Sequence, residues 1–64
     1  MCLSTVYKNT MVPEAVAMRN VMSIECKDGL VILTDLMERT CVIEGTLEKA
    51  DLVNGSVIVR EAAV

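Results

Sequence analysis

The sequence predicts an all-β protein, a small and strongly bent antiparallel barrel of about five strands in a single domain over residues 1–64. Short runs rich in Val, Ile and Leu alternate with polar residues at the period of two that strands show. Two dipeptides typical of tight turns, Asp28-Gly29 and Asn54-Gly55, stand between or before such runs. A chain of 64 residues has room for one hydrophobic core.

The amino-terminal third predicts one strand and one ambiguous segment. Residues 2–8 (CLSTVYK) alternate, with odd-numbered side chains on one face and even-numbered side chains on the other. Residues 13–21 (PEAVAMRNV) fit either a short helix with Pro13 in its first turn or an extended strand. We favour a mostly extended segment, because about five strands are needed to close a small barrel.

The middle of the chain predicts a β-hairpin around Asp28-Gly29. In the run before the turn, Met22, Ile24 and Cys26 are expected to share one face. The run after it, LVILT, is apolar on both faces. This pattern predicts a central strand that is buried on both sides.

The remaining residues predict two further strands with a turn between them. RTCVIEG (residues 39–45) places Cys41 and Ile43 on one face of a strand. LEKADLV (residues 47–53) is less clear and is compatible with one helical or 3₁₀ turn before the last strand. NGSVIVRE (residues 54–61) begins with a turn signal and continues as the closing strand.

The composition predicts a core without aromatic side chains. Apolar residues make up 53% of the chain, but Tyr7 is its single aromatic residue. The core must therefore be built from Val, Leu, Ile, Met and Ala. Because so short a chain often gains stability by oligomerising, we expect a homodimer.

The charge disfavours nucleic acid and membrane surfaces as partners. The formal net charge is −3, and the six basic residues are scattered along the chain. Non-specific nucleic-acid binding depends on Lys and Arg that neutralise phosphates, and single strands also need aromatic rings for stacking. Anionic membranes attract basic segments instead of acidic ones. No apolar stretch approaches the ~20 residues that a transmembrane helix needs.

The cysteines point to a reducing compartment. Cys2, Cys26 and Cys41 are an odd number, which excludes a complete disulfide framework within one chain. The sequence shows no basic segment followed by an apolar run, as a signal peptide would. We therefore expect a cytoplasmic protein whose thiols are reduced.

Catalysis is not expected. The chain has no histidine, so the commonest general base is missing. None of its three glycines lies in a phosphate-binding motif. Five glutamates are predicted to be surface charges: Glu14, Glu25, Glu38, Glu44 and Glu48.

Cys2 is the candidate metal ligand. Cys26 and Cys41 fall in apolar strand patterns and are predicted to be small core fillers. The five methionines fit gap fillers in a core without phenylalanine. Cys2 instead combines a thiolate with neighbouring main-chain nitrogens, whether Met1 is kept or removed. Such planar N and S donors suit Ni(II) or Cu(II), and two chains around a two-fold axis could share one ion. The alternative is that Cys2 is merely a small apolar residue.

Four segments taken together resemble the CooT family. Its members are small nickel-binding accessory proteins associated with maturation of carbon monoxide dehydrogenase. The segments are MCLSTVY, PEAVAMRNV, SIECKDGLVILTDL and GTLEKADLVNGSVIV. The resemblance implies a small SH3-like barrel, a homodimer with Ni(II) at the subunit boundary, and Cys2 as the metal ligand. It also implies nickel storage or delivery to a client metalloenzyme such as carbon monoxide dehydrogenase.

Two alternatives remain at this point. The HypC-type hydrogenase maturation chaperones also begin with MCL, and they hold an iron fragment through the same cysteine position. They usually continue with a proline, as in MCLAIP, which this chain lacks. A small protein- or RNA-binding module is the second alternative, and the acidic charge argues against the RNA version.

Overall fold

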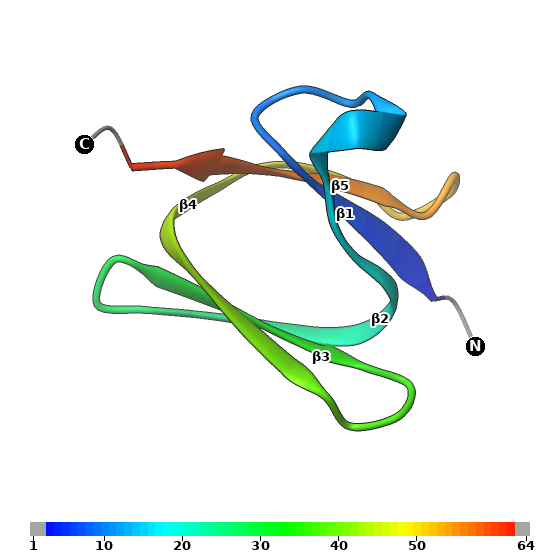
Figure 1. The fold of residues 1–64 in the computed structure, drawn as a ribbon, viewed down its shortest axis with the longest axis horizontal. Helices are drawn as coiled ribbons and strands as arrows, with labels where there is room; N and C mark the ends of the chain where they lie inside the picture. Colours follow the sequence, from blue (N-terminus) through cyan, green and yellow to red (C-terminus); the bar gives the residue numbers. More distant parts are fainter. Residues whose placement is uncertain (1–2, 63–64) are drawn as a thin grey trace.

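The computed structural model describes residues 3–62 and shows five strands in one closed barrel (Figure 1). The predicted all-β class and the small five-stranded barrel are confirmed. The strands are β1 (Ser4–Lys8), β2 (Val16–Lys27), β3 (Leu30–Asp35), β4 (Thr40–Asp51) and β5 (Ser56–Glu61).

Each strand pairs with the next one along the chain in antiparallel fashion, and β1 pairs with β5 to close the barrel. This last pair is parallel, with Thr5 opposite Ser56. The reason is the odd number of strands. When five strands alternate in direction, the first and the last run the same way, so a closed barrel of this kind must contain one parallel pair.

The ambiguous stretch before the hairpin is mostly extended, as favoured from the sequence. Pro13–Ala15 forms a single 3₁₀ turn, η1, and β2 begins directly after it at Val16. Within residues 3–62 this turn is the one helical segment, and no helix there has the length and apolar character needed to cross a membrane. The extended part is therefore the first half of one long strand and not a separate strand.

Strand β2 bends so that it serves both sides of the barrel. Its first half pairs with β1 and its second half with β3. Val21 lies where the partner changes, opposite Ser4 of β1 and Asp35 of β3. The start of β1 and the end of β3 are therefore brought to the same corner of β2.

The helical or 3₁₀ turn suggested for residues 47–53 is wrong. Strand β4 continues through this segment to Asp51 and pairs with β5, and only residues 52–55 form the turn. The local pattern is polar and helix-tolerant, but the main-chain groups of this segment find their partners on β5. Tertiary pairing overrides the local preference here.

Gly45 allows β4 to change partners from β3 to β5. Residue 44 still pairs with β3, whereas Gly45 pairs with Glu61 of β5. A Cβ atom at position 45 would lie 2.1 Å from the Arg60 carbonyl oxygen. Because that neighbour is main chain, only glycine fits at this bend.

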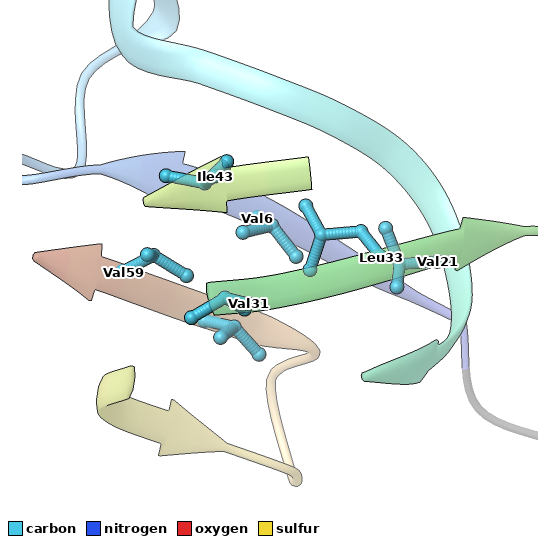
Figure 2. Packing of buried hydrophobic residues seen from close by; sticks show 7 residues of the cluster. Val6, Val21, Val31, Leu33, Ile43 and Val59 are labelled. Atoms are coloured by element: carbon cyan, nitrogen blue, oxygen red, sulfur yellow. The ribbon is translucent and has the colours of Figure 1, made fainter. Parts of the chain in front are cut away.

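The core lies inside the barrel and receives a side chain from every strand. Figure 2 shows these side chains pointing toward one another between the strands. Four partly buried residues pack against them: Ala17, Met18, Ile24 and Cys41. The prediction that the methionines fill gaps in the core is correct for Met18 and wrong for Met11, Met22 and Met37, which are exposed. The predicted aromatic-free core is confirmed, since its buried members are Val6, Val21, Val31, Leu33, Ile43, Val57 and Val59.

Strand β3 is buried on one face only, contrary to the prediction of burial on both sides. Val31 and Leu33 are fully buried, while Leu30 and Ile32 are half-buried on the outer face. A single sheet that closes on itself has one inner face and nothing that covers the outer one. The apolar residues on the outer face of β3 are therefore partly covered and do not belong to a second core.

The expected common face of Met22, Ile24 and Cys26 is also only partly correct. Ile24 packs against the core, but Met22 and Cys26 are exposed. The register of β2 against β3 shifts between Val21 and Ser23, and this bulge moves Met22 off the face of Ile24. Cys26 keeps the face of Ile24 but is exposed near the end of β2, next to the hairpin turn. Val21 takes the inward position that the simple pattern assigned to Met22.

Candidate metal-binding site

The predicted ligand Cys2, and Met1 with it, lie outside the described residues. The structure does show how the next residues are held. Leu3 is half-buried, and Ser4 begins β1, which lies between β2 and β5. Ser4 is opposite Val21, and Thr5 is opposite Ser56. The chain next to Cys2 is therefore fixed to the barrel on both sides.

The turn between β4 and β5 lies beside this segment. The Thr5 N–H donates a hydrogen bond to the Gly55 carbonyl at 2.8 Å. Within the turn, the Asp51 carboxylate accepts hydrogen bonds from the Asn54 side chain at 2.8 Å and from its N–H at 3.1 Å. These hydrogen bonds lower the pKa of Asp51, so the carboxylate stays charged and keeps the turn closed.

An apolar groove opens at the same end of the molecule, with a volume of about 390 Å³. It is bounded by the bend of β2 on one side and the end of β4 on the other. Met22 and Leu52 on its walls are exposed, and Val53 beside it is 95% exposed. We call this surface the groove face and define it by its lining residues and Val53: Ser4, Val21, Met22, Ser23, Ile24, Ala50, Leu52, Val53 and Val57.

The other two cysteines are not brought together. Cys26 is exposed on β2, so its predicted role as a core filler is wrong. Cys41 packs against the core from β4, as predicted. Strand β3 lies between the two strands that carry them. Among residues 3–62, no group of three or more Cys, Asp or Glu side chains is close enough to hold a metal ion.

The five glutamates predicted to be surface charges are all exposed. One of them, Glu48 on β4, accepts a hydrogen bond from Arg60 Nε at 2.7 Å across to β5. None of them lines the apolar groove described above. These carboxylates therefore contribute solvated charge and a cross-strand ion pair.

Sequence reasoning missed the one charged side chain that is buried among the described residues, Asp35, which is 2% exposed. Its carboxylate accepts hydrogen bonds from the N–H groups of Met37 and Arg39, both at 2.9 Å, and from Arg39 Nε at 2.8 Å. The available signal was an aspartate at the end of an apolar run with an arginine four residues later. Its role is structural, since every contact closes the turn between β3 and β4.

The family comparison covers nearly the whole chain. A family profile described as CO dehydrogenase accessory protein CooT matches residues 1–60. The chain belongs to the CooT family. The match includes Cys2, both turns and all of β1 to β4, so CooT membership rests on nearly the whole barrel.

CooT membership confirms the family predicted from the sequence and gives the protein an accessory role toward CO dehydrogenase. Among curated proteins, none matches the chain.

Proposed function

We propose that this CooT-family protein binds Ni(II) through the Cys2 thiolate and stores or delivers the ion for the assembly of CO dehydrogenase. It acts in the cytoplasm as a carrier and not as a catalyst. The observation that carries the proposal is the family match over residues 1–60, which includes Cys2. The exposed Cys26 and the core-packed Cys41 lie on different strands, so Cys2 is the better candidate.

The donor chemistry of Cys2 fits nickel as cargo. A thiolate and neighbouring main-chain nitrogens offer the planar N and S donors that Ni(II) accepts, whereas Zn(II) prefers a tetrahedron. One chain supplies a single such thiolate at this position. We therefore propose a homodimer in which two copies of Cys2 bind the same ion around a two-fold axis.

The groove face supports a second copy of this chain as the partner. Cys2 directly precedes Leu3, and consecutive Cα atoms are about 3.8 Å apart. One ion shared by two copies of Cys2 therefore brings the two Leu3 segments close together, along with the surfaces around them. That surface carries exposed Met22, Leu52 and Val53, and exposed apolar patches of this kind mark contact sites.

A nickel titration of the parent protein and of the Cys2→Ala variant tests this proposal. The parent should bind one Ni(II) per two chains and develop a thiolate-to-nickel charge-transfer band. Cys2→Ala should remain folded, but it should lose both the bound Ni(II) and the charge-transfer band. Cys26→Ala is the matched control, because it removes an exposed thiol at a different place in the chain, and it should bind nickel like the parent. Nickel binding of parental strength in Cys2→Ala would place the site elsewhere.

A further inference from the structure

The turn between β4 and β5 contacts the first residues that follow Cys2. The Gly55 carbonyl accepts a hydrogen bond from the Thr5 N–H at 2.8 Å, and Ser56 is opposite Thr5 in the parallel β1–β5 pair. Figure 1 shows the turn and the start of β1 at the same end of the molecule. The first described residues, Leu3 to Thr5, are therefore positioned against this turn.

Gly55 leaves space for the main chain of Leu3. A Cβ atom at position 55 would lie 3.1 Å from the Leu3 carbonyl oxygen and 3.9 Å from the Ser4 Cα atom. The first distance is shorter than an ordinary van der Waals contact. Any side chain at position 55 would therefore push Leu3 away by a few tenths of an ångström, unless the turn itself moved.

The turn is held in place by its own hydrogen bonds. The Gly55 N–H donates to the Asp51 carbonyl at 2.9 Å, and Asn54 donates twice to the Asp51 carboxylate. Gly55 has a φ of +71°, which glycine adopts without strain. Because the turn has these hydrogen bonds of its own, we expect a side chain at position 55 to displace Leu3 and not the turn.

We propose that Gly55 is a positioning residue for the nickel site, and this inference rests on the proposed binding of Ni(II) by Cys2. The absence of a side chain at Gly55, together with its hydrogen bond to Thr5, sets the position of Leu3. Leu3 in turn sets the direction in which the chain enters Cys2. Metal–ligand distances hold within about 0.2 Å in well-formed sites, so a displacement of this size matters.

The chain offers a matched pair of glycines to test this inference. Gly29, in the turn between β2 and β3, has a φ of +77°, close to that of Gly55, but a Cβ atom there meets nothing within 4 Å. Alanine at either position bears the cost of a left-handed backbone. Only Gly55→Ala also displaces Leu3.

The experiment measures Ni(II) affinity and the thiolate-to-nickel absorption band for the parent, Gly55→Ala and Gly29→Ala, with thermal unfolding of the metal-free proteins. We expect Gly55→Ala to lose about tenfold in nickel affinity, as is typical when the support of a metal ligand is removed, and to shift the band. Gly29→Ala should bind nickel like the parent, although both variants unfold at a lower temperature.

Parental nickel affinity and an unchanged band in Gly55→Ala would overturn the inference, while loss of nickel in Cys2→Ala would still support the proposed function. Equal losses of affinity in the two glycine variants would also overturn it, because the cause would then be general destabilisation. If Gly55→Ala does not fold, Gly55→Asn replaces it, since asparagine tolerates a positive φ and still adds a Cβ atom. Nickel bound by Cys2→Ala would overturn the proposed function and this inference together.

Discussion

Asp35 shows how one buried charge can organise a turn. Burial raises the pKa of its carboxyl group, but hydrogen bonds from Arg39 and Met37 and the charge of Arg39 lower it more. The net effect is a pKa below the ordinary value of an aspartate. The carboxylate is thus charged in the folded protein at neutral pH, and its donors all come from the turn that it closes.

We predict that Asp35→Asn lowers stability at neutral pH, because the neutral amide cannot accept all three hydrogen bonds or pair with Arg39. The pKa of Asp35 is depressed by folding, so its contribution is present above the pKa of the unfolded chain. The contribution is lost as the pH falls through the lower folded-state value. Urea unfolding of the parent and the variant between pH 7 and pH 2 measures the contribution of Asp35 to stability at each pH. This is roughly the range in which aspartates titrate.

The difference between the two urea midpoints should be largest near neutral pH and shrink in acid. Asp51→Asn is a comparison for a carboxylate that also has a lowered pKa but lies half-buried at the end of β4, beside the turn to β5. A parent–variant difference for Asp35→Asn that stays constant over the whole pH range would show that its ionisation does not support the turn.

At the scale of the element, β4 depends on one residue to serve two partners. Its first part pairs with β3 and its second part with β5, and Gly45 lies at the change. The Gly45 N–H also donates a hydrogen bond to the Gly29 carbonyl at 2.9 Å, which ties the bend to the tip of the β2–β3 hairpin. Strands β4 and β5 and the turn of the β2–β3 hairpin therefore meet at a position that has no room for a side chain.

We predict that Gly45→Ala destabilises the barrel by about 3 kcal/mol or more, at the upper end of single-substitution effects. The added methyl group would overlap the Arg60 carbonyl, and main chain can yield only by opening the β4–β5 pair. Gly29→Ala, where space is open, should cost about 1 kcal/mol. Urea unfolding measures both values, and equal losses would mean that the close approach at Gly45 has no energetic weight.

At the scale of the whole molecule, the barrel is small and leaves apolar side chains uncovered. Its buried core holds aliphatic residues only, which bury less area than aromatic ones. Leu52 and Val53 at the turn between β4 and β5 are 72% and 95% exposed. A second copy that covered the groove face would add apolar burial that the single chain lacks.

We predict that Val53→Asp weakens the proposed dimer by roughly tenfold or more in dissociation constant, because a buried contact with a partner would be replaced by a charge. Val42→Asp is the matched control. Val42 is 58% exposed on the part of β4 that pairs with β3, away from β1 and β5. Sedimentation of the metal-free and nickel-bound proteins measures the association, and equal dissociation constants for the two variants would exclude the groove face as the subunit contact.

The strands could be predicted from the sequence because the signals that form them are local. Alternation at residues 39–45 and the Asp28-Gly29 turn place apolar and polar side chains on opposite faces regardless of the rest of the chain. Cys2 could be singled out in the same way, from a thiol that neighbours main-chain nitrogens. The continuation of β4 to Asp51 could not be predicted, since its reason lies on β5.

The sequence by itself therefore determined the all-β class, the aliphatic core, both turns and the family to which the chain belongs. Only the tertiary structure decided the parallel closure of β1 on β5, the burial of Asp35, the exposure of Cys26, and the contact between Gly55 and Leu3. For the closure of the barrel and for the contact between Gly55 and Leu3, the physical reason is distance along the chain. Side-chain periodicity and turn preference act over a few residues. Closure of the barrel instead joins segments about fifty residues apart, so a local sequence pattern cannot predict that contact.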